Sequence, residues 1–103
     1  MESQRVLAKY PDRCPIICSR GNTNVPEIDK VKYLAPKDIT LGQFTYVIRK
    51  RIKLPPETGL FLFINNKSLI QNTALMENVY RNYRNEDGFL YISYSGENTF
   101  GDI

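Results

Sequence analysis

The stretch from Thr40 to Ile52 constrains the fold of this chain more than any other. Thr40 and Gln43 have the spacing of a capping box, in which the two side chains satisfy unpaired backbone groups at a helix start. Apolar residues then recur at helical spacing, at Leu41, Phe44, Val47, Ile48 and Ile52. Because Pro55-Pro56 cannot continue a helix, the pattern predicts an amphipathic helix that ends before this pair and lies across a sheet.

Strand-like segments lie on both sides of this helix. Alternating or continuous apolar residues predict four strands, over residues 13–19, 30–35, 59–64 and 89–94. In the first of them Cys14, Ile16 and Cys18 share one face. Pro15 and Ile17 share the other face, and Pro15 favours an edge strand or a strand start because it lacks an N–H.

Two further helices are expected. A short one covers residues 2–10, and another begins near Asn72 or Thr73, with Leu75, Val79 and Tyr83 on one stripe and with Met76 and Tyr80 beside that stripe. The predicted order is helix, strand, strand, helix, strand, helix, strand. This order is typical of an α+β domain of the ubiquitin-like kind, with a mixed four-stranded sheet. A length of 103 residues allows one such domain, over 1–103.

Composition excludes most catalytic chemistry. The chain has no histidine, which removes Ser-His and Cys-His nucleophile pairs and imidazole metal ligands. Cys14 and Cys18 are four residues apart on a predicted strand, too far for a disulfide, and we expect two small buried side chains. No set of residues suggests a metal site, and we expect neither an enzyme nor a bound cofactor.

Charge and hydropathy narrow the surroundings of the protein. No apolar run approaches the roughly 20 residues that span a bilayer, and the N-terminus does not resemble a signal peptide, so we expect a cytoplasmic protein. Arg49-Lys50-Arg51, with Lys53 beyond, forms a basic run. It could attract nucleic acid, but no stacking motif lies beside it, and we expect a solvated helix face.

Six stretches of the sequence carry a family resemblance. In chain order they are KYPDRCPIIC, IDKVKYLAP, GQFTYVIRKRI with LPPE after it, LFLFINN, TALMENVYRNY and DGFLYISYSGENTFG. Together they resemble the autophagy-related protein 8 family of ubiquitin-like modifiers, of the GABARAP and microtubule-associated light-chain type. The resemblance covers nearly the whole chain and implies a ubiquitin-like β-grasp with a short N-terminal helix.

The resemblance implies a modifier whose C-terminus is processed and conjugated. A cysteine protease would cleave between Gly101 and Asp102 within an extended tail over residues 96–103, with Phe100 as a recognition handle. Activating and conjugating enzymes would then transfer Gly101 to phosphatidylethanolamine. A glycine suits this chemistry because it has no Cβ to hinder approach to its carbonyl. The lipid-linked form would be displayed on autophagosomal or other membranes.

The resemblance also implies a binding site for partner peptides. Such a peptide carries an aromatic residue, two variable residues and an aliphatic residue, and adds a strand to the edge of the second predicted strand. The implied aromatic pocket consists of Glu2, Val6, Pro15, Ile17, Lys32, Leu34 and Phe89. The implied aliphatic pocket consists of Tyr33, Ala35, Pro36, Ile39, Phe44 and Val47. Acidic residues of the peptide would meet Lys30, Lys32 and Arg51.

The sequence departs from the family before its first strand. Family members have two helices there, whereas this chain starts at the equivalent of the second, so we expect the first helix to be missing or cut short.

Two alternative functions remain at this stage. The main one is a ubiquitin-like peptide-binding adaptor that is never conjugated and retains Asp102 and Ile103. Nucleic-acid binding through the basic run ranks below it.

Overall fold

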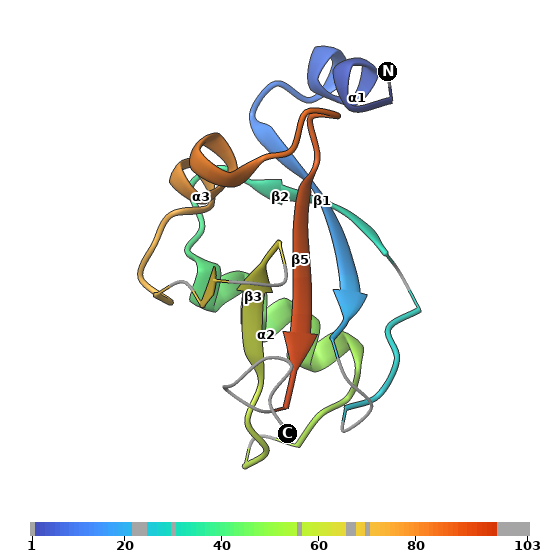
Figure 1. The fold of residues 1–103 in the computed structure, drawn as a ribbon, viewed down its shortest axis with the longest axis vertical. Helices are drawn as coiled ribbons and strands as arrows, with labels where there is room; N and C mark the ends of the chain where they lie inside the picture. The colour runs from blue at the N-terminus through green and yellow to red at the C-terminus, as the bar shows by residue number, and fades with distance from the viewer. Residues whose placement is uncertain are drawn as a thin grey trace.

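The computed structural model describes residues 2–21, 25–29, 31–55, 57–65, 68–69 and 71–96. Three helices and five strands follow one another along the chain (Figure 1). They are α1 (Glu2–Lys9), β1 (Arg13–Arg20), β2 (Lys32–Pro36), α2 (Leu41–Arg51), β3 (Phe61–Ile64), β4 (Ser68–Leu69), α3 (Met76–Tyr83) and β5 (Leu90–Ser95). The predicted order of elements is confirmed, and the two-residue strand β4 is an addition that is too short to leave a periodic pattern.

The strands form one mixed sheet in the order β2-β1-β5-β3-β4. β1 pairs antiparallel with β2 and parallel with β5, while β3 pairs antiparallel with both β5 and β4. This arrangement places β2 at one edge of the sheet and the C-terminal strand β5 in the middle. The α+β prediction with a mixed sheet is therefore confirmed.

Pro15 lies in an internal strand, where its missing N–H would normally break a ladder. Of the two predicted settings, an edge strand or a strand start, the edge strand was wrong, whereas Pro15 does lie near the start of β1. The register explains why the residue is tolerated there. β1 begins at Arg13, and its pairing with β5 starts only at Ile16, opposite Leu90. The amide of Cys18 donates to Val31 beside β2, so alternation directs the Pro15 nitrogen toward β5, just before that ladder begins.

The capping box of α2 forms as the sequence predicts. The Thr40 hydroxyl accepts from the Gln43 amide at 3.2 Å, and the Gln43 side-chain oxygen accepts from the Thr40 amide at 2.8 Å. The next two amides, of Leu41 and Gly42, donate to the carbonyl oxygens of Ala74 and Asn72 at 2.8 and 2.9 Å. The start of α2 is thus fully hydrogen-bonded, half by its own box and half by the loop before α3.

That use of the loop corrects the predicted start of the last helix. α3 begins at Met76, not near Asn72 or Thr73, because the 72–74 backbone turns toward α2. Leu75 is the N-cap and makes no side-chain cap. The buried face of α3 consists of Met76, Val79 and Tyr80, whereas Leu75 and Tyr83 are exposed, so the predicted stripe was rotated.

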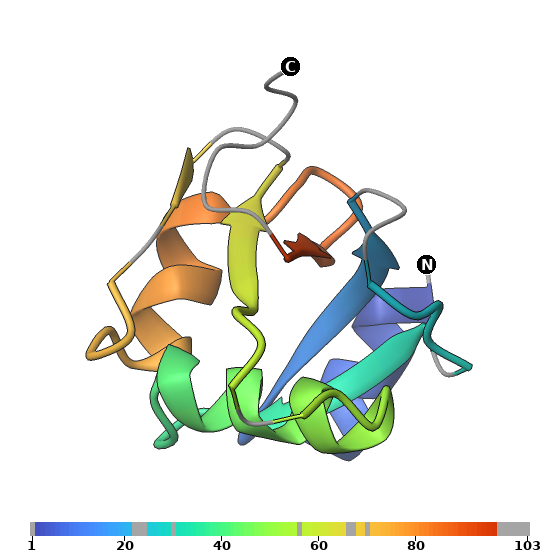
Figure 2. The same ribbon diagram turned by 90° about the horizontal axis from the view of Figure 1, so that it is seen from below.

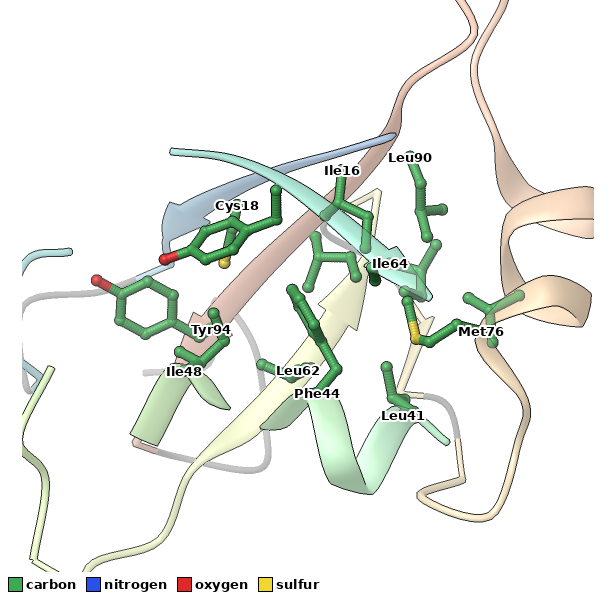
Figure 3. Close-up of a cluster of buried hydrophobic side chains, with 14 of the residues drawn as sticks. Ile16, Cys18, Leu41, Phe44, Ile48, Leu62, Ile64, Met76, Leu90 and Tyr94 are labelled. Atoms are coloured by element: carbon green, nitrogen blue, oxygen red, sulfur yellow. The ribbon is translucent and has the colours of Figure 1, made fainter. Parts of the chain in front are cut away.

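The core lies between the sheet and α2, which crosses the concave face of the sheet (Figure 2). Side chains from β1, α2, β3, α3 and β5 meet there (Figure 3). Figure 3 labels Ile16, Cys18, Leu41, Phe44, Ile48, Leu62, Ile64, Met76, Leu90 and Tyr94. Cys14 and Cys18 are buried free thiols, as predicted. α1 packs against β1, and Pro15 on the strand face opposite the core is fully buried.

Candidate functional site

β2 is one of the two edge strands of the sheet, and its outer side can accept a further strand. Among the residues that the structure describes, β2 pairs with β1 alone. Its residues alternate as the sequence predicts, with Tyr33 and Ala35 buried, Leu34 half-buried and Lys32 exposed. An extended chain laid along this edge could bond to the β2 backbone while its side chains reach the surface beside Leu34.

A cavity of about 500 Å³ lies beside this edge. It is lined by Glu2 and Val6 of α1, Arg13 of β1, Lys32, Tyr33 and Leu34 of β2, and Phe89 before β5. Five of the seven residues predicted for the aromatic pocket are in this lining. The other two, Pro15 and Ile17, lie opposite Leu34 and Lys32 in the β1–β2 register and do not line the cavity.

Two residues of the cavity wall, Arg13 and Tyr33, were not in the predicted aromatic pocket. Arg13 shares a face of β1 with Pro15 and Ile17, a signal that could have identified it. Its guanidinium lies 3.5 Å from the Leu34 carbonyl oxygen and 3.9 Å from the Asp12 carboxylate. Tyr33 was assigned to the aliphatic set instead. A cavity with aliphatic, aromatic and guanidinium walls suits a flat aromatic side chain.

The residues predicted for the aliphatic pocket divide into two groups. Tyr33, Ala35 and Phe44 are core residues, and the rings of Tyr33 and Phe44 meet edge to face with centroids 5.7 Å apart. Burial raises the pKa of the Tyr33 hydroxyl to about 12. The other three residues reach the surface: Pro36 and Ile39 are half-buried and Val47 is 44% exposed.

Both described cations that were predicted to meet acidic residues are held by carboxylates of the chain itself. Lys32 Nζ lies 2.8 and 2.7 Å from the two carboxylate oxygens of Glu2. Arg51 Nε donates to Asp29 Oδ1 at 3.0 Å, and this hydrogen bond holds the pKa of the Asp29 carboxyl below its usual value. Lys30, the third predicted cation, lies outside the described residues.

The predicted conjugation site also lies outside the described residues. These end at Gly96, and Phe100, Gly101 and Asp102 follow later in the chain. β5 ends at Ser95, and a Cβ on Gly59 would lie 3.7 Å from the Gly96 carbonyl oxygen. The chain therefore leaves the sheet beside the loop that precedes β3.

The described part of the chain holds neither a metal-binding cluster nor a membrane-spanning helix. No group of three or more His, Cys, Asp or Glu residues there could hold a metal ion. No described helix has the length and apolar composition needed to cross a membrane.

Comparison with known proteins identifies the family. A family model described as autophagy protein Atg8, ubiquitin like, matches residues 1–101. The chain is 55% identical to Autophagy-related protein 8 of Mycosarcoma maydis over 103 residues, which cover 99% of this chain and 86% of that relative.

Two solved structures are similar to the fold. One is Trypanosoma brucei ATG8, with a TM-score of 0.88 and 44% identity, covering 97% of this chain and 86% of that one. The other is Plasmodium falciparum Atg8 in complex with a Plasmodium falciparum Atg3 peptide, with a TM-score of 0.83 and 34% identity, covering 93% of this chain and 85% of that one. The chain belongs to the Atg8 family of ubiquitin-like autophagy proteins.

Proposed function

We propose that this protein is a membrane-displayed adaptor that recruits partners carrying an aromatic-x-x-aliphatic motif. The observation that carries the proposal is the cavity beside the open edge of β2. The peptide adds a strand to that edge and places its aromatic side chain in the cavity, between Leu34 and Phe89. Its aliphatic side chain lies near Val47, over the junction of β2 and α2.

The similarity to Plasmodium falciparum Atg8 supports peptide binding, because that structure is a complex with an Atg3 peptide. The expected affinity follows from opposing contributions. Burying an aromatic ring of roughly 150–250 Å² and an aliphatic side chain is favourable, while ordering the peptide largely offsets the gain. Single motifs therefore bind in the micromolar range, and many copies on one membrane raise the avidity.

The proposal includes processing and lipid conjugation. A cysteine protease removes Asp102 and Ile103, and activating and conjugating enzymes transfer Gly101 to phosphatidylethanolamine. Two acyl chains are enough for stable attachment, whereas a single chain holds only marginally. The protein then divides between the cytoplasm and the autophagosome surface. Membership of a ubiquitin-like family supports this chemistry, and the sequence contains a Phe-Gly pair, Phe100-Gly101, after which the protease would cut.

A binding measurement with paired variants tests the peptide site. Fluorescence anisotropy of a labelled motif peptide should give micromolar affinity, and Leu34→Ala should weaken it about tenfold or more, because Leu34 lines the cavity. Leu75→Ala is the matched control, since Leu75 is 39% exposed and adjoins α3. Equal affinity for the wild type and Leu34→Ala would count against this site.

Intact mass tests conjugation. Protein isolated from its own cells should include a form that ends at Gly101 and carries a phospholipid, and Gly101→Ala should abolish it. A chain that always ends at an unmodified Ile103 would instead support the alternative, a peptide-binding adaptor that is never conjugated.

A further inference from the structure

Two of the described cations in or near β2, Lys32 and Arg51, are paired with carboxylates that precede the strand in the chain. Lys32 starts the strand, and its partner Glu2 lies in α1 across the cavity. Arg51 ends α2, and its partner Asp29 lies just before β2. Asp29 is three positions before Lys32, the first residue of β2, so this second pair lies near the start of the strand as well.

Both pairs are exposed to solvent. The side chains of Lys32 and Glu2 are 60% and 55% exposed, and those of Arg51 and Asp29 are 44% and 76% exposed. Ion pairs of this kind are weak and exchange readily, so another carboxylate at the same position can replace the internal one. An acidic peptide on the β2 edge brings such carboxylates and must displace Glu2, Asp29 or both.

We propose that Glu2 and Asp29 are internal competitors for the acidic residues of a bound peptide. This inference rests on the peptide binding proposed above and assigns a specificity role to the two carboxylates. Each holds a cation that the peptide needs, so the apparent affinity for an acidic peptide is reduced by the fraction of time the cation is occupied. A peptide with neutral flanks makes no ion pair with these cations and gains nothing when they are released.

The consequence is a restrained preference for acidic partners. The wild-type chain discriminates less between acidic and neutral flanks than its positive charges alone would allow. Removing either internal carboxylate releases a cation and should increase that discrimination. Because an exposed pair is weak, the increase should be about 1.5- to 5-fold for each carboxylate.

The test uses two peptides that differ only in their flank. Both carry the same aromatic-x-x-aliphatic core, one preceded by glutamates and the other by glutamines. Calorimetry gives the ratio of their dissociation constants for the wild type, Glu2→Gln and Asp29→Asn. We expect the ratio to favour the acidic peptide more strongly in both variants, and the gain to shrink between about 50 mM and about 500 mM salt because salt screens exposed charges.

Two controls separate competition from a change in net charge. Glu57→Gln removes the same charge from an exposed residue that has no ion pair within the described part of the chain, and it should leave the ratio near that of the wild type. In a Lys32→Gln background, Glu2→Gln should no longer increase the ratio, because no cation is left to release.

The possible results are distinct. An unchanged ratio in both variants, with normal wild-type binding, overturns the competition and leaves the proposed function standing. An equal gain in Glu57→Gln also overturns it, in favour of net charge. No binding of either peptide to the wild type overturns the proposed function and this inference together.

Discussion

At the scale of the residue, burial decides what the two cysteines can do. Cys14 and Cys18 are fully buried on the core face of β1, and the Cys14 thiol faces the Met76 carbonyl oxygen at 3.8 Å. Burial raises the pKa of Cys14 to about 11 and that of Cys18 to about 12, from 9.0. Since the thiolate is the reactive form, these are inert packing residues at neutral pH.

The same shifts predict the response of stability to alkali. Well below pH 9.0 the thiols are protonated in both the folded and the unfolded chain, and their titration has no effect on stability. Above it the unfolded chain loses protons that the folded chain retains, so the free energy of unfolding falls as pH rises toward 12. Urea unfolding across this range should show the decline, and Cys18→Ala should make it shallower. A slope that is unaffected by Cys18→Ala would contradict the assignment.

At the scale of the element, the sequence predicts helix and strand boundaries best where they depend on contacts between neighbouring residues. The capping box of α2 was predictable because Thr40 and Gln43 bond to each other's backbone, three positions apart. The start of α3 was not, because the carbonyl oxygens of Asn72 and Ala74 accept hydrogen bonds from the first amides of α2, and this part of the chain does not open a helix. β2 begins at Lys32 instead of Lys30, although the Val31 carbonyl still accepts from β1.

The candidate site likewise combines residues that the sequence could identify with contacts that it could not. Alternation along β1 and β2 together with the family resemblance identified most of the cavity wall. The ion pairs could not be predicted, because Glu2 and Lys32 are 30 positions apart and Asp29 and Arg51 are 22 apart. Such contacts depend on how α1 and α2 pack on the sheet, and no sequence period encodes them. The conjugation site at Gly101 stays a prediction from the sequence.

Two threonines, one at the start of α2 and one in the loop before α3, supply a matched test of helix capping. Thr40→Ala removes the acceptor of the Gln43 amide and should lower the free energy of unfolding by about 1 kcal/mol. Thr73→Ala changes an exposed threonine that caps no helix and should have an effect within about 0.5 kcal/mol. Urea denaturation measures both. Equal losses would mean that the α2 box is not a specific stabilising contact.

At the scale of the whole molecule, one core joins the sheet to α2 and so fixes where β2 and the cavity lie. Neighbouring residues of α2 test this directly, because Ile48 is fully buried and Val47 is 44% exposed. Ile48→Ala should lower the free energy of unfolding by about 2–5 kcal/mol. Val47→Ala should change it by no more than about 0.5 kcal/mol. Thermal or urea unfolding would contradict this packing if the two losses were similar.

The account of function depends on the open edge of β2, and an NMR titration tests it most directly. A motif peptide is added to the isotope-labelled chain while the backbone amides are monitored. We expect the largest shifts along residues 31–35 and at Val6 and Phe89, with contacts between the peptide backbone and β2 that define an added strand. Shifts confined to β3 and β4 at the opposite edge of the sheet, or no shifts at saturating peptide, would contradict the account.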